Sequence, residues 1–134
     1  MTKVDLLPYI FFGGTAMEAM EFYKDVFGGE LDVQAMGDVP KDAQPAGSKS
    51  TDVMHARLSG AVNLLASDSK KASPEAKKIE LSISGDDKLT LKKYFKKLSE
   101  GGNITMPLAK QFWGDEFGMV TDKYGVDWMI NITS

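Results

Sequence analysis

Two side chains that could take part in chemistry stand close together near the middle of the chain. His55 is its only histidine and Arg57 its only arginine, and one residue separates them. An arginine offers a planar fork of donors to a carboxylate or phosphate, and a histidine exchanges a proton near neutral pH. The pair predicts an anion- or carbonyl-binding site. The alternative is a structural histidine beside an arginine that forms an ion pair with an acidic neighbour.

The pair lies in a segment, residues 52–58, that has the pattern of a strand. Alternate residues of a strand point to the same face, so His55 and Arg57 are expected to share one face of a sheet. A two-residue turn at 59–60 would place His55 opposite Leu64 on the next strand. The residues of the other face are expected to pack against a helix: Met54, Ala56 and Leu58.

Further polar candidates lie in the second half of the chain. Glu80 and Ser82 alternate with apolar residues over 79–83, which predicts a strand with one apolar face. Its polar face would line a pocket or meet solvent. Gln111 and Trp113 stand near the turn between two later strands, where the indole would either stack on a ligand or belong to the core.

Composition limits the classes of protein to consider. The chain has 134 residues and a net charge of −3, so we expect one domain over 1–134 and no binding to nucleic acid, which requires a basic surface. Cysteine is absent, which excludes thiolate metal sites and a cysteine nucleophile and suits a cytoplasmic protein. The apolar run at 6–12 is too short to span a membrane, and no dinucleotide, Walker or nucleophile-elbow motif is present.

The apolar periodicity predicts the order strand–helix–strand–strand–strand twice. The first module covers about residues 4–69, and its helix begins after Thr15, with Glu18 completing a capping box. A linker over 70–77 separates it from a second module at about 78–134. The expected elements of the first module are a strand at 6–12, a helix at 16–27, strands at 31–36, 52–58 and 62–67, and a long loop at 37–51. Those of the second are a strand at 79–83, a helix at 89–98 and strands at 105–112, 117–121 and 127–132.

The two modules match each other at a fixed offset. Shifting the first by 72 positions superposes Gly13 on Gly85 and aligns the apolar residues of the two helices, which indicates an internal duplication. Each module would form a curved sheet with a helix on one face. We therefore expect a ligand to bind on a concave surface between the two sheets.

Three segments carry a resemblance to a known family. These are the helix end EFYKDVFGG at 21–29, the run FWGD at 112–115 and the run DKYGVDW at 122–128. The chain resembles the vicinal oxygen chelate superfamily of glyoxalase I, extradiol dioxygenases, fosfomycin-modifying enzymes and bleomycin-sequestering proteins. Within it, the chain is similar to the PhnB-like branch, sometimes labelled 3-demethylubiquinone methyltransferase-like. The resemblance implies an α+β fold of curved mixed sheets around a cavity, helices on the outer faces, and a homodimer.

The resemblance also implies where a metal site would lie. Superfamily enzymes hold a divalent ion with His and Glu side chains, and the corresponding positions are Pro8, Leu64, Lys78 or Glu80, and Met129. Only Glu80 could ligate such an ion. We therefore expect the usual metal site to be lost and predict no cofactor, with a weakly held metal as the alternative.

These observations lead to three hypotheses of function. The first and preferred one is a small-molecule-binding protein with an apolar pocket and a cationic anchor. The second is a superfamily enzyme of lyase, transferase or dioxygenase type with a rebuilt catalytic site around His55 and Glu80. The third is an interaction module without a ligand. No glycine-rich S-adenosylmethionine motif supports methyl transfer. The predicted ligand-binding residues are Phe12, His55, Arg57, Leu64, Glu80, Ser82, Gln111, Trp113 and Met129.

Overall fold

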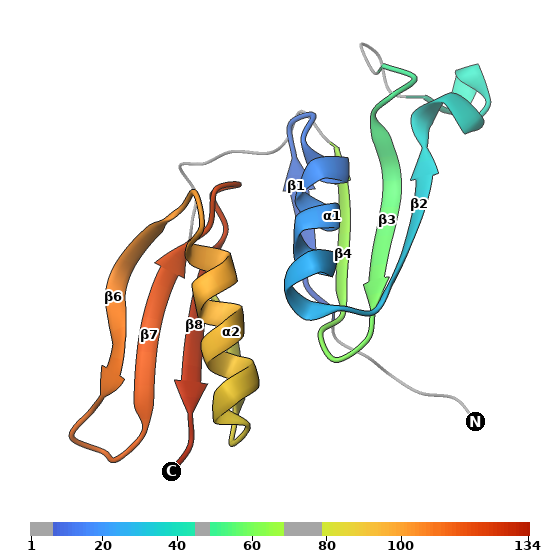
Figure 1. Ribbon diagram of the computed structural model, residues 1–134. Helices are drawn as coiled ribbons and strands as arrows, with labels where there is room; N and C mark the ends of the chain where they lie inside the picture. The colour runs from blue at the N-terminus through green and yellow to red at the C-terminus, as the bar shows by residue number, and fades with distance from the viewer. Residues whose placement is uncertain (1–6, 45–48, 69–78) are drawn as a thin grey trace. The chain divides into compact units, whose positions relative to one another are not determined.

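The computed structural model describes residues 7–44, 49–68 and 79–134 (Figure 1). The chain divides into two compact units, Met1–Ala72 and Ser73–Ser134. The division falls inside the linker predicted at 70–77, which lies outside the described residues. Each unit is a four-stranded mixed sheet with one α-helix.

The first unit follows the predicted order of elements. Its sheet has the order β1-β4-β3-β2, in which β1 and β4 are parallel and the other neighbours are antiparallel. Two short 3₁₀ turns follow β2: η1 (Met36–Asp38) begins at the last residue of the strand predicted at 31–36, and η2 (Lys41–Ala43) lies within the predicted long loop. The remaining elements are β1 (Tyr9–Phe12), α1 (Ala16–Phe27), β2 (Glu30–Ala35), β3 (Val53–Ser59) and β4 (Leu64–Asp68).

The second unit repeats this topology, with the sheet order β5-β8-β7-β6 and a parallel pair β5–β8. The first residues of the two helices are 72 positions apart, and so are their last residues. The shared order and pairing confirm the duplicated fold. The elements are β5 (Leu81–Gly85), α2 (Lys88–Ser99), β6 (Asn103–Lys110), β7 (Glu116–Thr121) and β8 (Asp127–Ile132).

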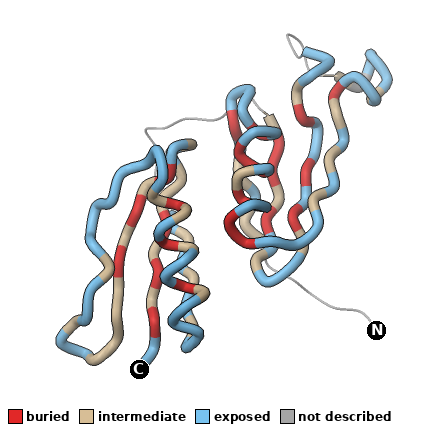
Figure 2. Tube along the Cα trace, in the orientation of Figure 1, coloured by how far each residue is buried: buried red, intermediate tan, exposed pale blue. Residues whose placement is uncertain are grey.

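Each helix buries one side against its own sheet. The apolar residues of α1 recur at spacings of three and four, which places them on one side of the helix. Figure 2 shows that the buried residues of each unit follow this side of the helix and the strands beneath it. In the first unit the buried helix residues are Ala16, Ala19, Met20, Tyr23, Val26 and Phe27, and in the second they are Leu91, Phe95 and Leu98. Because each helix covers only one face, the opposite face of each sheet has no cover from its own unit.

The first strand differs from its prediction. A buried strand was expected over 6–12, whereas β1 has four residues, of which Tyr9 and Phe11 are 40% and 50% exposed and only Phe12 is buried. The apolar run therefore supplies residues to both faces of the sheet, and α1 covers only one of them. Leu6 lies outside the described residues.

The start of α1 is capped by Asp68 at the end of β4. One carboxylate oxygen of Asp68 accepts hydrogen bonds from the backbone N–H groups of Gly14 and Ala16, at 2.9 and 3.0 Å. The other accepts from the backbone N–H of Val53, at 2.8 Å. The predicted capping box is wrong, because the side chain of Thr15 makes no capping hydrogen bond. A residue distant in sequence takes this role and joins α1, β3 and β4.

We expect Asp68→Ala to lower the free energy of unfolding of the first unit by about 2 kcal/mol, because three backbone donors lose a charged acceptor. Urea unfolding followed by the NMR signal of the single histidine, which lies in this unit, measures the loss. Asp68→Asn retains one acceptor oxygen and should lose about half as much. Equal stability of Asp68→Ala and the parent chain would show that water replaces the carboxylate at no cost.

Candidate functional site

The candidate site begins on the face of the first sheet that α1 leaves open. The strand register pairs Tyr9 with Leu65, and Leu65 with Arg57, so these three side chains form a row across β1, β4 and β3. His55 stands two residues before Arg57 on the same face, and both side chains are exposed. The prediction that His55 and Arg57 share one face is thus confirmed.

Aromatic and polar groups meet in this row. The hydroxyl oxygen of Tyr9 lies 3.3 Å from Nδ1 of His55, within hydrogen-bond distance. The ring of Tyr9 stacks on that of Phe11, with centroids 4.9 Å apart and planes inclined by 26°. The surface therefore combines a flat apolar area with an imidazole that can donate or accept a hydrogen bond.

Arg57 keeps most of its donors available. Its Nε donates a hydrogen bond to the Ser59 hydroxyl at 3.2 Å. Asp32 stands opposite Arg57 in the β2–β3 register, yet the two described side chains form no ion pair. The guanidinium can therefore present its terminal N–H groups to a carboxylate or phosphate, as a bidentate contact requires.

The prediction that His55 lies opposite Leu64 is wrong, because β3 and β4 pair in a different register. Leu58 pairs with Leu64 and Arg57 with Leu65, because five residues, 59–63, separate the last paired residues in place of the two expected. In this turn the side-chain oxygen of Asn63 accepts a hydrogen bond from the backbone N–H of Gly60. Leu64 is consequently buried beneath α1, at 1% exposure, and Leu65 lies on the open face.

Two other predictions for the first unit fail for related reasons. Phe12 lies on the helix-covered face, because it alternates with the exposed Phe11. Met54 is 36% exposed, and Val53 is buried in its place, since the β2–β3 register shifts at Ala35. The aromatic residues Tyr9 and Phe11 were not predicted, although their alternation with Ile10 and Phe12 is visible in the sequence.

In the second unit, Ser82 and Met129 stand side by side in the β5–β8 register on the face opposite α2. Met129 also pairs with Met119, and Met119 with Met106, so three methionines lie next to one another across β8, β7 and β6. This row was not predicted, because the sequence alone does not give the register of these strands. Thioether side chains adapt their shape to irregular apolar ligands.

The other predicted residues of this unit lie at the ends of strands. Glu80 is exposed just before β5. Gln111 donates a hydrogen bond from Nε2 to the backbone oxygen of Ala109 at 2.9 Å. Trp113 is half exposed, and its ring meets that of Phe117 edge-on at 6.0 Å. Trp113 was expected either to stack on a ligand or to belong to the core. Its exposure rules out the core position.

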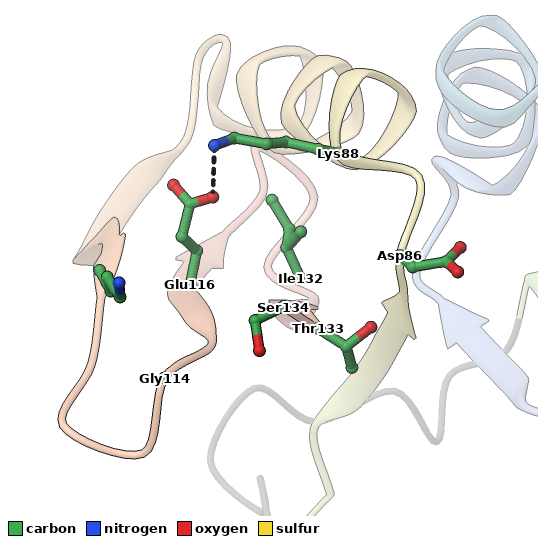
Figure 3. A pocket seen from close by; sticks show the side chains of 8 residues that line it. Asp86, Lys88, Gly114, Glu116, Ile132, Thr133 and Ser134 are labelled. Atoms are coloured by element: carbon green, nitrogen blue, oxygen red, sulfur yellow. Dashed lines mark ion pairs between the residues drawn. The ribbon is translucent and has the colours of Figure 1, made fainter.

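A hollow of about 360 Å³ lies at one end of the second unit (Figure 3). Lys88, Lys110 and Glu116 contribute to its walls and Ile132 to its base. None of the residues predicted from the sequence lines it.

The donor set does not fit the superfamily's divalent ion. After the register correction, the open-face side chains at the ligand positions of the first unit are Tyr9 and Leu65, and those of the second are Glu80 and Met129. A single carboxylate with alkyl and thioether neighbours is a poor set of ligands for a hard or borderline ion. Within residues 7–44, 49–68 and 79–134, no group of three or more His, Cys, Asp or Glu could hold a metal. Nor is any described helix long and apolar enough to cross a membrane.

The paired β-α-β-β-β units define the class of protein. The fold matches the structure of a glyoxylase/bleomycin resistance protein/dioxygenase domain from Frankia sp. EAN1pec, with a TM-score of 0.64 at 11% identity over the full length of both chains. At this identity the likeness shows the fold alone, and it confirms the fold class predicted from the sequence.

The family follows from closer matches. The family model described as 3-demethylubiquinone-9 3-methyltransferase matches residues 4–131, and the chain belongs to this family. Protein YjdN of Escherichia coli K12 is 31% identical over 95% of this chain and 94% of its own length.

Two solved structures are similar over nearly the whole chain. Protein PA1353 from Pseudomonas aeruginosa is 38% identical, with a TM-score of 0.83 and 98% of each chain covered. A PhnB protein from Bacillus cereus is 24% identical, with a TM-score of 0.72, 97% of this chain and 100% of its own covered. The resemblance to the PhnB-like branch is confirmed.

Proposed function

We propose that the chain is a small-molecule-binding protein and that the open face of its first sheet carries the binding site. The observation that supports this most is the Tyr9–His55 contact at 3.3 Å beside an arginine without an ion pair among the described residues. Polar groups arranged in this way on an aromatic surface are typical of ligand sites, where a few polar contacts fix orientation and apolar area contributes affinity.

The chemistry of these groups indicates the class of ligand. Arg57 would bind a carboxylate or phosphonate, His55 would donate to or accept from a neighbouring oxygen, and the rings of Tyr9 and Phe11 would contact an apolar or aromatic body. Ser82, Met129, Gln111, Trp113 and Glu80 remain predicted ligand contacts on the second unit. Phe12 and Leu64 lie beneath α1, and the proposal does not use them.

The sequence and the surface of the protein bear on its cellular compartment and its oligomeric state. We infer a cytoplasmic protein, which the absence of cysteine from the sequence supports. We also infer a homodimer, because exposed apolar side chains of the described residues, Ile79 and Phe112 among them, offer surface that a second copy could cover.

The binding site is tested by replacing Arg57. Because the chain has one histidine and one arginine, its imidazole ring signals and its Nε–H signal can be attributed to these residues directly. Titration with benzoate and phenylphosphonate should shift the His55 ring and Arg57 Nε–H signals saturably. Arg57→Ala should weaken this binding at least tenfold, about 1.4 kcal/mol, and leave thermal stability unchanged. Arg57→Lys retains the charge without the fork and should fall between the two.

Lys96→Ala, which removes an exposed charge from the second unit, serves as the control and should bind as the parent does. Two results would contradict the proposal: unshifted His55 and Arg57 signals with both probes, or an Arg57→Ala chain that binds normally but has lost stability. Turnover of methylglyoxal and glutathione with added nickel, manganese or zinc, abolished by His55→Ala or Glu80→Gln, would favour the enzyme hypothesis instead.

A further inference from the structure

The hollow of the second unit lies at one edge of its sheet, where three strands end and a fourth strand and the helix begin. It is formed by the residue after β5, the first turn of α2, the end of β6, the turn to β7 with its first residue, and the end of β8 with the two residues that follow. Its volume of about 360 Å³ is within the range of small-ligand pockets, roughly 300–1,000 Å³. All of its lining residues belong to the second unit, so it does not involve the face that carries Tyr9, His55 and Arg57.

Two lysines and two carboxylates line the hollow, and Lys92 of α2 adds a third ammonium group beside Glu116. Nζ of Lys88 lies 3.1 Å from one carboxylate oxygen of Glu116, and Nζ of Lys92 lies 3.9 Å from the other. Glu116 is therefore compensated by two lysines of α2. Lys110 pairs with Glu116 in the strand register but forms no ion pair within the described part of the chain. Figure 3 shows the side chain of Lys88 reaching across to Glu116 and the carboxylate of Asp86 pointing away from them.

The remaining walls offer hydroxyl groups and apolar area. The backbone N–H and the hydroxyl of Thr133 both donate hydrogen bonds to the backbone oxygen of Gly85, at 2.8 and 3.2 Å. These bonds hold the residues after β8 against the end of β5. The Ser134 hydroxyl adds a donor at the rim, and the buried side chain of Ile132 forms an apolar base. An anion bound near Lys110 would also lie close to the Lys88 ammonium group and to a hydroxyl donor. The rest of the hollow could hold a carbon skeleton.

We propose that this hollow binds a small organic phosphate, with the phosphoryl group between Lys110 and Lys88 and the organic part over Ile132. Ammonium groups bind phosphates as point charges from several directions, and two of them can share a dianion. The phosphoryl group alone would leave most of the volume empty, since one water accounts for about 30 Å³ of liquid. The ligand is therefore expected to bind more tightly than inorganic phosphate.

The test compares glycerol 3-phosphate with inorganic phosphate by calorimetry and by backbone amide NMR. Glycerol 3-phosphate should bind and shift the amide signals of Gly114, Thr133 and Ser134. Lys110→Gln should weaken its binding at least tenfold. Lys93→Gln removes the same charge from the exposed side of α2, away from the hollow, and should bind as the parent does.

Three outcomes would overturn the proposal. These are absence of binding at millimolar concentration, equal weakening by Lys93→Gln and Lys110→Gln, and loss of binding in Arg57→Ala. The last would place the phosphate on the first unit and leave the proposed function standing. Normal glycerol 3-phosphate binding in Arg57→Ala, with loss in Lys110→Gln, would support two independent sites.

Discussion

Gly118→Ala is expected to lower the free energy of unfolding of the second unit by about 3 kcal/mol. Gly118 lies on β7 beneath α2, where a Cβ atom would stand 2.7 Å from Cε1 of Phe95 and 2.9 Å from Cα of Leu108. The phenylalanine ring could rotate away, but the Leu108 backbone is part of β6. Relief of this contact would therefore require β6 and β7 to move apart, at the cost of their hydrogen bonds.

Both tryptophans of the chain lie in the second unit, so tryptophan fluorescence during urea unfolding reports on this unit alone. Gly85→Ala is the matched control. Its Cβ would meet only Cδ1 of Leu91 at 3.6 Å, an ordinary contact, and the change should stay within about 0.5 kcal/mol. If both variants unfolded at the same urea concentration as the parent, the close approach at Gly118 would carry no energetic weight.

Asp122→Ala should have a still larger effect, about 4 kcal/mol, because it removes a buried acceptor shared by three donors. The Asp122 carboxylate is 3% exposed and accepts from the backbone N–H groups of Tyr124 and Val126, at 2.8 and 3.1 Å. It also accepts from Nε1 of Trp128, at 2.8 Å, in the core. One side chain thereby joins the β7–β8 turn to the largest buried residue of the unit.

Asp122→Asn separates these contacts. Its amide oxygen can still accept from the two backbone groups of the turn, whereas its NH₂ group would face the indole N–H, so about half of the loss is expected. Urea unfolding gives the stability, and the emission maximum of the native state shows whether Trp128 stays buried. Equal losses for the two variants would mean that the indole contact contributes nearly all of the energy.

The helices were the most predictable part of the fold. Apolar residues at spacings of three and four, together with Gly28 and Gly29 after the first helix, fixed α1 at Ala16–Phe27 as predicted. Both glycines have positive φ, at 74° and 96°, which other residues rarely adopt. The signal is strong because it is local: each residue's place depends on neighbours three or four positions away.

The candidate site was less predictable, because it depends on strand register. The spacing of His55 and Arg57 gave their shared face correctly. The position opposite them depended on the length of one turn, and five residues in place of two moved Leu64 to the covered face. The hollow lined by Lys88, Lys110 and Glu116 could not be found from the sequence, since its residues come from three stretches of the chain, 86–88, 110–116 and 132–134.

The parallel pairs β1–β4 and β5–β8 have a consequence for how the protein forms. In the first unit the register joins Tyr9 to Leu65, so its sheet is complete only once β4 has been made, yet it needs nothing beyond Asp68. Pairing of such distant segments is slow compared with helix formation, because a long loop must close first. All strands of the first sheet are therefore available to a nascent chain before the strands of the second have been synthesised.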